Sequence, residues 1–595
     1  MTPVFKNLVE MQQYSCKVHK DRDMYGTKQE DGSFSWTTYG RFAEKTDQFR
    51  GGLSRLGIGR GDKVAVISGN CVEWVVGCYA SYGLGAHYVP MYESQKIEDW
   101  VYIIKDSGAK ILLVKTPEIF NRVRSLTEEI PDLAHVVPLY EDSTLEYDYP
   151  GLCRTGKAAP VPALNPDPED PMGLIYTSGT TGNPKGVILS HRSMITEIQA
   201  LMEVAKARPF SPDDRGLSFL PWGHLMGQLQ EVHILMYVGF SSGLVRDINE
   251  IIDDLAQVRP TLFFAVPRLY TKLYEGVMKN IEQKNRMIRA LFNSGLNSVV
   301  KMNQGEAVSI LDGMIAGLAK RLVFSRIREL FGGRLRMAFS GGAALNENVV
   351  KFLEGIGIPL FEGYGQTETT MAVTMNFPGC RRQGSVGKPI PNAVVKVDQS
   401  IGDTRPGEGE IVVYGPLLML GYHNLPDETA ATIGPDGGCR TGDIGRFDED
   451  GFLYLTGRIK EIYKLENGKY VSPGPLEEEL KLSPYINQVL ITGVNQRYNV
   501  AIITPETETV DAWAQETGID TKASGWQADP RILDLFDREI KTHSVDFKGF
   551  EKPGKFKLAW DDWSVDNALL TPTLKLKRRQ VTQKYQAEID SLYGN

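Results

Sequence analysis

The chain has 595 residues, of which 42% are hydrophobic and 24% charged, and this length is too great for a single hydrophobic core. Its formal net charge of −8 argues against nucleic acid as the main partner, because no basic excess is available to neutralise phosphates. The six cysteines form no CxxC pair, so the sequence indicates neither a disulfide framework nor a zinc site and favours a reducing compartment.

Targeting signals are not evident in the sequence. Residues 1–10 lack a basic segment followed by an apolar core, and residues 591–595 match neither the peroxisomal nor the ER-retention ending. No apolar stretch reaches the roughly 20 residues that a membrane span needs. We therefore expect a cytoplasmic protein, while peripheral contact with the inner membrane surface and homodimerisation stay open.

Short apolar runs alternate with helical patterns along most of the chain. The runs predicted to be strands are 63–68, 110–114, 172–175, 261–266 and 335–340. A helix is expected at 73–82, directly after the first strand. Near-continuous apolar strands separated by helices are typical of largely parallel sheets that are buried on both faces. The prediction is an α/β fold whose large N-terminal domain consists of layered sheets with helices.

A long helical segment is predicted at about 274–328. Its apolar residues recur at spacings of three and four, as in Met287, Ile288, Leu291, Leu311, Met314, Ile315, Leu318 and Leu322. Our main interpretation is that these side chains pack onto the core. A contact with a membrane surface or a partner is the alternative.

The character of the sequence changes at residues 457–461, where a polar stretch interrupts the α/β pattern. A helix is then expected at 476–482, followed by strands at 488–493 and 499–504. We predict three parts: an N-terminal domain at 1–457, a hinge at 458–461, and a small, mobile α+β domain at 462–595.

A glycine- and hydroxyl-rich loop follows the predicted strand at 172–175. Its sequence, Tyr-Thr-Ser-Gly-Thr-Thr-Gly-Asn-Pro-Lys-Gly-Val, can direct backbone N–H groups, hydroxyls and one ammonium at a polyphosphate. It is not a Walker A loop, because no Gly-Lys-Ser/Thr closes it. A merely polar surface loop is the alternative. The candidate ligands are Thr177, Ser178, Gly179, Thr180, Thr181, Gly182 and Lys185.

Three more motifs follow predicted strands or precede a hairpin. The glycines of Ser340–Ala344 allow close approach of a flat ligand, although a tight turn would also explain them. Tyr364–Glu368 places an aromatic ring, a hydroxyl and a carboxylate within five residues, and one carboxylate plus substrate phosphates suffices for Mg²⁺. Asp443, before a predicted hairpin at 446–454, could accept hydrogen bonds from a ribose diol or simply occupy a turn.

Together and in this order, the motifs resemble those of the adenylate-forming enzymes, which include acyl-CoA synthetases, luciferases and peptide-synthetase adenylation domains. The resemblance spans about residues 30–585. The long helical segment and the pattern Leu-Thr-Pro-Thr-x-Lys at 570–575 resemble the long-chain fatty acyl-CoA synthetases. This implies the conversion of fatty acid, ATP and CoA to acyl-CoA, AMP and pyrophosphate through an acyl-adenylate, with Mg²⁺ as cofactor.

The resemblance also implies roles for the nucleotide-binding residues. Gly341, Gly342 and Ala343 would line the adenine face, Tyr364 would stack on the adenine, and Gly365 beside it would also belong to the cofactor site. Thr367 would bind a phosphate oxygen. Glu368 would hold Mg²⁺ together with Thr180, and Asp443 with Arg458 would bind the ribose or phosphate.

The remaining implied roles concern the acyl group, CoA and the hinge. His224, a histidine near an apolar strand and so a structural residue in most proteins, would lie at the entrance for the acyl carboxylate. Lys575 would be the catalytic lysine, with Lys577 as the fallback, although the family more often has glycine where this chain has Leu574. Lys460 would be the hinge residue. Gly468, in the loop 466–471, would face the pantetheine channel after rotation of the small domain.

The lysine has a clear electrostatic task. Bringing a carboxylate to the α-phosphate places like charges together, which costs roughly 4 kcal/mol at 4 Å and an effective dielectric of 20. A positioned ammonium offsets this repulsion. Three alternatives stay open: an acyl-AMP ligase or acyl-carrier-protein synthetase, an enzyme for medium-chain or aryl acids, and a non-catalytic binding protein on the same fold.

Overall fold

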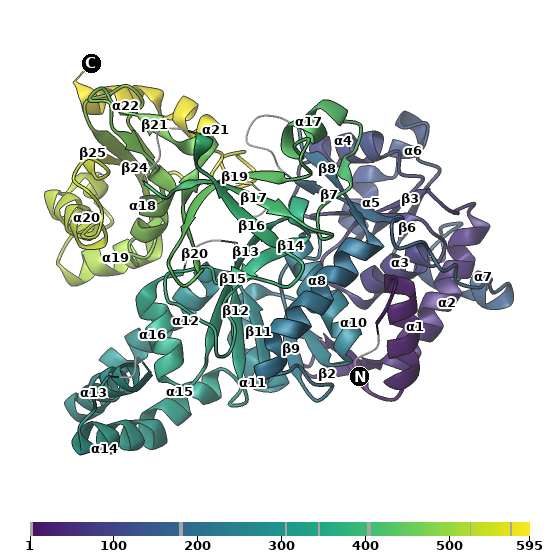
Figure 1. The fold of residues 1–595 in the computed structure, drawn as a ribbon, viewed down its shortest axis with the longest axis horizontal. Helices are drawn as coiled ribbons and strands as arrows, with labels where there is room; N and C mark the ends of the chain where they lie inside the picture. The colour runs from purple at the N-terminus through teal and green to yellow at the C-terminus, as the bar shows by residue number, and fades with distance from the viewer. Residues whose placement is uncertain are drawn as a thin grey trace.

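The computed structural model describes residues 4–177, 183–303, 306–342, 345–401, 406–523, 525–571 and 574–594. The chain forms a large lobe up to about residue 458 and a smaller lobe that contains the C-terminus (Figure 1). Layered sheets with helices form the large lobe, and a small α+β unit follows, as the sequence predicted. The boundaries proposed for the hinge remain a prediction.

A seven-stranded sheet lies at the centre of the N-terminal half. Its order is β18-β8-β7-β4-β3-β5-β6. The strands are β18 (Gly421–Tyr422), β8 (Lys185–Ser190), β7 (Pro171–Thr177), β4 (His87–Met91), β3 (Lys63–Ile67), β5 (Ile111–Val114) and β6 (His135–Pro138). Strands β7, β4, β3, β5 and β6 run parallel, and crossover helices such as α3 (Val72–Tyr82) and α4 (Ile97–Ser107) connect them. The predicted strands at 63–68, 110–114 and 172–175 are confirmed.

Three further sheets complete the large lobe. One has the order β2-β1-β10-β9 and consists of β2 (Phe34–Thr38), β1 (Asp23–Lys28), β10 (Ser241–Leu244) and β9 (Arg215–Ser218). A second runs β11 (Leu262–Ala265), β12 (Met337–Ser340), β13 (Leu360–Gln366), β14 (Met371–Met375) and β15 (Lys388–Pro389). The antiparallel third runs β16 (Val394–Asp398), β17 (Gly409–Tyr414), β19 (Cys439–Phe447) and β20 (Leu453–Arg458). The predicted strands at 261–266 and 335–340 and the hairpin at 446–454 are confirmed.

Helices and short turns surround these sheets. The remaining helices of the large lobe are α1 (Leu8–Val18), α2 (Tyr39–Arg55), α5 (Pro117–Val123), α6 (Leu126–Glu129), α7 (Tyr149–Ala158), α8 (His191–Val204), α9 (Leu225–Gly227), α10 (Ile234–Val238), α11 (Ile251–Val258), α12 (Pro267–Glu282), α13 (Arg286–Asn303), α14 (Ile310–Ala319), α15 (Ser325–Leu330), α16 (Glu347–Gly355) and α17 (Pro426–Thr432). A π-helical turn at Gln228–His233 lies between α9 and α10, and another at Lys320–Phe324 lies between α14 and α15.

The small lobe has its own sheets and its own core. Its strands are β21 (Tyr463–Lys464), β22 (Tyr470–Val471), β23 (Ile486–Thr492), β24 (Asn499–Pro505) and β25 (Pro553–Leu558). Its helices are α18 (Pro473–Leu480), α19 (Thr507–Glu516), α20 (Pro530–His543), α21 (Arg578–Lys584) and α22 (Gln586–Tyr593). Buried residues such as Leu480, Ile491 and Phe536 form a cluster separate from that of the large lobe, so this unit has its own hydrophobic core.

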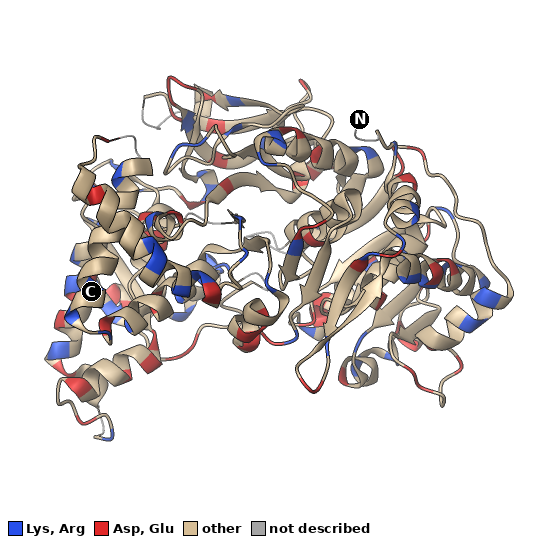
Figure 2. Ribbon diagram, turned by 90° about the horizontal axis from the view of Figure 1, so that it is seen from below, with Lys and Arg blue, Asp and Glu red and all other residues tan. Residues whose placement is uncertain are grey.

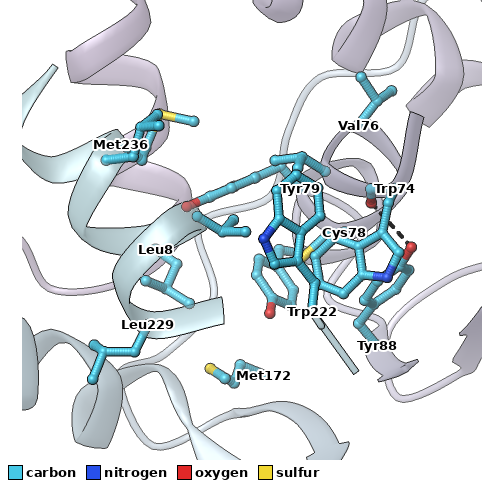
Figure 3. Packing of buried hydrophobic residues seen from close by; sticks show 14 of the residues in the cluster. Leu8, Trp74, Val76, Cys78, Tyr79, Tyr88, Met172, Trp222, Leu229 and Met236 are labelled. Atoms are coloured by element: carbon cyan, nitrogen blue, oxygen red, sulfur yellow. Dashed lines mark hydrogen bonds between the residues drawn. The ribbon is translucent and has the colours of Figure 1, made fainter. Parts of the chain in front are cut away.

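The largest hydrophobic cluster lies where the seven-stranded sheet meets α1, α3 and the segment around Trp222 (Figure 3). Trp74 and Trp222 are fully buried, with ring centroids 5.4 Å apart. The Tyr88 hydroxyl donates a hydrogen bond of 3.0 Å to the Trp74 carbonyl. Aromatic rings therefore fix the position of Trp222, two residues before His224.

The predicted helical segment is present as α12 to α15, but its interpretation as core packing is wrong for one face. Ile288, Leu291 and Ile315 are half-buried, whereas Met287, Leu311, Met314, Leu318 and Leu322 are exposed. Helices α13 and α14 extend away from the body of the large lobe (Figure 1). Periodicity therefore identified the helices but not what covers them. Within the described residues, no helix is both long enough and apolar enough to cross a membrane.

Candidate active site

The predicted phosphate loop connects β7 to β8. Thr177 ends β7 and pairs with Lys185, which begins β8. The predicted ligands Ser178, Gly179, Thr180, Thr181 and Gly182 lie outside the described residues. The Lys185 ammonium forms an ion pair with Glu428 on α17 and lies 5.1 Å from the centre of the Tyr422 ring. The hydrogen bond from Lys185 lowers the pKa of Glu428.

The predicted adenine loop follows β12 directly. Gly342 has φ +89°, a conformation that side chains other than glycine rarely adopt. A Cβ on Gly341 would lie 3.3 Å from Cε of Met226, so this backbone approaches α9 closely. Ala343 lies outside the described residues. Strand β12 lies between β11 and β13 and runs parallel to both. The loop therefore begins at the carboxyl end of these parallel strands, which is where α/β proteins bind ligands.

The Tyr-Gly-Gln-Thr-Glu motif lies at the end of β13. A Cβ on Gly365 would lie 1.2 Å from the Met371 carbonyl oxygen, so only glycine fits here. Thr367 is buried, and Glu368 is half-buried in the short helical turn that follows. After the turn, Thr370 and Met371 have φ values of +54° and +91°. Such strained backbone beside a candidate site is typical of functional positions.

Asp443 joins the Tyr364 motif to the hairpin β19–β20. Its carboxylate accepts a hydrogen bond of 2.8 Å from the Tyr364 hydroxyl and one of 2.6 Å from Nε of Arg458. Arg458 lies directly opposite Asp443 in the antiparallel ladder. Burial, and then the charge of Asp443, raises the pKa of Tyr364. The arrangement holds the Asp443 carboxylate between an aromatic ring and a guanidinium, and a carboxylate is a suitable acceptor for ribose hydroxyls.

Lys575 belongs to the small lobe but interacts electrostatically with this part of the large lobe. Its backbone N–H donates a 3.0 Å hydrogen bond to Oγ1 of Thr571, and its ammonium lies within the electrostatic range of Arg458 and Asp443. Solvent still reaches the side chain, yet crowding by protein atoms, and then the charge of Arg458, lowers its pKa. Leu574 before it has φ +59°, in the left-handed region.

His224 caps the N-terminus of α9. Its Nδ1 accepts a hydrogen bond of 3.1 Å from the Met226 N–H, which leaves Nε2 as its other polar atom. The pKa of His224 is lowered to about 4, mainly by burial and in addition by the charge of Lys575. At neutral pH the ring is therefore neutral. The charge of Lys575 thus acts on His224, although the two residues lie 351 positions apart in the sequence.

Two residues that the sequence did not single out take part in this site. The Tyr422 hydroxyl donates a hydrogen bond of 2.8 Å to Oε1 of Glu368. Glu231, in a π-helical turn, binds the Ser218 hydroxyl and accepts a 3.0 Å hydrogen bond from Nε1 of Trp222. Burial raises the pKa of Glu231 to about 8. Glu231 thereby anchors the segment that leads to His224, but no local pattern marked either residue.

The hinge and CoA residues lie at the base of the small lobe. Lys460 is in the short turn Ile459–Glu461, and its charge acts on Glu428. Gly468, with φ +82°, lies in the turn between β21 and β22. Across the lobes, Nη2 of Arg268 donates a hydrogen bond of 2.9 Å to Oδ1 of Asn487. In this arrangement the charges of Arg458 and Asp443 act on Lys575.

Magnesium prefers one or two carboxylates together with phosphate oxygens as its ligands. Glu368 provides one carboxylate, oriented by Tyr422, and Thr367 precedes it in the chain. No group of three or more His, Cys, Asp or Glu residues that could hold a metal occurs in the described ranges. The residues therefore fit a magnesium ion that is held largely by the phosphates of a nucleotide.

Comparisons with known proteins cover nearly the whole chain. Residues 13–423 match the AMP-binding enzyme family, and residues 460–526 match the AMP-binding enzyme C-terminal domain. The long-chain-fatty-acid–CoA ligase FadD15 of Mycobacterium bovis is 31% identical over 574 residues, which cover 93% of this chain and 92% of that protein. Long-chain-fatty-acid–CoA ligase 1 of Homo sapiens is 30% identical over 622 residues, covering 99% of this chain and 86% of its own.

A solved structure supports the fold. The adenylation domain of a carboxylate reductase from Mycobacterium chelonae aligns with a TM-score of 0.77 and 20% identity, over 99% of this chain and 91% of that one. The two matched parts of the chain correspond to most of the large lobe and to the first half of the small lobe.

Charged residues of both signs are distributed over both lobes (Figure 2).

Proposed function

The chain belongs to the AMP-binding enzyme family, and on this basis we propose that it is a long-chain-fatty-acid–CoA ligase. It would use ATP to convert a fatty acid to an acyl-adenylate and then transfer the acyl group to CoA. The observation that carries the proposal is the hydrogen-bonded group of Tyr364, Asp443 and Arg458 in the large lobe, which lies close enough to Lys575 of the small lobe for their charges to interact. These residues supply what the first half-reaction needs: a nucleotide site and a cation.

In the first half-reaction, a carboxylate oxygen of the fatty acid forms a bond to the α-phosphorus of ATP, and the bond to pyrophosphate breaks. Lys575 offsets the repulsion between the two anions and stabilises the charge on the pentacovalent phosphorus. Asp443 would hold the ribose hydroxyls, and Tyr364 would support the adenine. Neutral His224 can donate a hydrogen bond to the acid from Nε2 without adding charge.

Magnesium belongs to this proposal as cofactor. When bound, it neutralises phosphate charge and polarises the phosphate oxygens. Glu368 would hold it, with Thr180 and Thr367 on the phosphate side, and Tyr422 would keep the carboxylate in place. Lys185 would exchange its contact with Glu428 for the phosphates of ATP, because a phosphate carries more negative charge than a carboxylate.

In the second half-reaction, the CoA sulfur attacks the acyl carbonyl, AMP leaves with the oxygen that came from the fatty acid, and the thiol proton is lost. We propose that the small lobe first rotates about Lys460, which would withdraw Lys575 and bring the Gly468 loop to the site. The contact between Arg268 and Asn487 would break during this rotation. Lid motions of this kind are common where one site performs two steps.

The test is product analysis with a panel of acids and acceptors. Purified protein is given ATP, Mg²⁺ and acids from C2 to C20, with either free CoA or a phosphopantetheinylated carrier protein. Long-chain acyl-CoA as the main product supports the proposal and shows the chain-length preference. Acyl-AMP that passes only to carrier protein, or turnover of aryl acids alone, would replace it with one of the related activities.

A further inference from the structure

Helices α13 to α15, residues 286–330, form an arm whose outer face is apolar. We define the outer face as Ile310, Leu311, Met314, Leu318 and Leu322, which follow one side of the continuous helix from 310 to 330. Their exposed fractions are 86%, 65%, 68%, 51% and 48%. Five large apolar side chains in one stripe differ from the scattered exposed residues that are usual on protein surfaces.

The opposite side of the same helix fixes this orientation. Ala316, Ala319 and Phe324 are buried against α13, and a Cβ on Gly295 would lie 2.2 Å from Cβ of Ala319. The rings of Phe292 and Phe324 pack edge to face, with centroids 6.0 Å apart. Close packing on small residues holds α14 firmly against α13, so the helix cannot roll to bury its outer face.

The charge of the arm is opposite to that of the chain. Residues 286–330 contain seven Lys or Arg and three Asp or Glu, whereas the whole chain has a net charge of −8. Lys320, Arg321 and Arg326 are exposed, and among the described ion pairs none involves them. Arg321 lies three residues after Leu318, on the same side of the helix. An apolar stripe with cations beside it is typical of helices that lie in a membrane interface.

We propose that the arm docks the protein on an anionic lipid bilayer, with the outer face inserted among the lipid chains and the basic residues at the headgroups. A second copy of the chain is a poor occupant, because a symmetric contact through this face would place Arg321 and its neighbours against the same cations. The arm extends away from the lobe (Figure 1), so a flat surface can reach it. The proposal does not depend on the proposed function.

The test is flotation with vesicles in the absence of nucleotide. We expect the wild-type protein to float with vesicles of phosphatidylcholine containing about one third phosphatidylglycerol, and much less with phosphatidylcholine alone. High salt should weaken the binding, because it screens the headgroup charges. The variant Met314→Glu/Leu318→Glu should bind at least about tenfold more weakly, since it loses two apolar side chains that would insert into the bilayer.

A second variant and a matched control separate the two contributions. Lys320→Gln/Arg321→Gln should lower binding to the anionic vesicles by about tenfold or more and have little effect on phosphatidylcholine. Leu533→Glu, at another exposed leucine but in the small lobe, should bind like the wild type. Circular dichroism and thermal unfolding show whether each variant is folded.

Three results would overturn the proposal. One is that the wild-type protein floats with vesicles of neither composition. The Met314→Glu/Leu318→Glu variant could bind as well as the wild type. Light scattering could instead reveal a dimer that this variant separates, which would assign the outer face to a second copy. None of these measurements requires turnover, so a failure here is distinguishable from a failure of the proposed enzyme activity.

Discussion

The hydroxyl of Tyr422 donates a hydrogen bond of 2.8 Å to Oε1 of Glu368, 54 positions earlier in the chain. Tyr422 lies in β18, at the edge of the seven-stranded sheet, and Glu368 follows β13 of another sheet. Lys185 lies over the same tyrosine ring. Tyr422 therefore connects the lysine of the phosphate loop to the carboxylate proposed to hold magnesium.

This connection predicts that Tyr422→Phe weakens magnesium-dependent adenylation. The ring and its packing remain, but Glu368 loses the partner that orients it, and losses of about tenfold are typical for such outer contacts. Pyrophosphate release measured over a range of Mg²⁺ concentrations should show a higher magnesium requirement. Tyr414→Phe is the control, because Tyr414 makes a 2.7 Å hydrogen bond to Asp436 outside the site. Equal behaviour of the two variants would contradict the role of Tyr422.

Lys575→Ala should remove adenylation selectively. The loss of a positioned charge at the reacting phosphate is expected to lower the rate of acyl-AMP formation by about 100- to 1000-fold. Thioester formation from supplied acyl-AMP should be largely spared, since the lysine is withdrawn for that step. Lys577→Ala, two residues away, is the matched control. Loss of activity in Lys577→Ala alone would assign the catalytic role to that residue.

Lys460→Pro should have the opposite pattern. Proline fixes φ and restricts the preceding residue, so it limits rotation of the small lobe. We expect acyl-AMP formation within about threefold of the wild type and thioester formation reduced by at least about tenfold. Both half-reactions are measured separately by rapid quench, with Lys460→Ala as the control for loss of the side chain. Equal losses in both steps would contradict rotation about this residue.

Acid should destabilise the large lobe through its buried histidines. The pKa values of His191 and His233 are lowered to about 3, mainly by burial. Unfolding returns each pKa to about 6.5, so below that pH the unfolded chain binds protons that the native chain does not. The free energy of unfolding that these neutral histidines contribute is therefore fully present above pH 6.5, and it decreases as the pH falls towards 3. We expect a slope of about 1.4 kcal/mol per pH unit for each histidine below about pH 5.5.

Chemical denaturation at a series of pH values measures this slope, and His233→Asn should reduce it.

His543 should have the opposite dependence on pH. Burial opposes its charge, but Glu479 and Glu539 raise its pKa to about 9. Its contribution is complete below pH 6.5 and is lost as the pH rises through 9. His543→Gln should therefore abolish the loss of stability between pH 6.5 and 9; an alkaline profile that stays like that of the wild type would contradict this assignment.

Local sequence patterns predicted most of the fold that carries the site. The strand at 63–68 and the helix after it were recognisable because parallel strands that are buried on both faces have continuous apolar runs. Gly365 was recognisable as part of a motif, and the structure shows why only glycine fits so close to Met371. The resemblance marked Leu574 as unusual, and its φ of +59° places it in a conformation that glycine adopts readily.

Contacts between distant segments could not be predicted in this way. Tyr422 and Glu231 carry no local signal, because their partners are brought to them by sheet order and by a π-helical turn. The outer face of α14 was mistaken for core for a related reason. A spacing of three and four residues shows which side of a helix is apolar, but it does not show whether another element covers that side.

In the proposed reaction a fatty acid oxygen attacks the α-phosphorus of ATP, and an isotope label on that oxygen shows where it goes. Fatty acid labelled with ¹⁸O in its carboxylate is converted with ATP and CoA, and the products are analysed by mass spectrometry. Acyl-adenylate chemistry should leave one ¹⁸O in AMP for each acyl-CoA formed and none in pyrophosphate. The label in inorganic phosphate, with ADP as the nucleotide product, would contradict the acyl-adenylate mechanism.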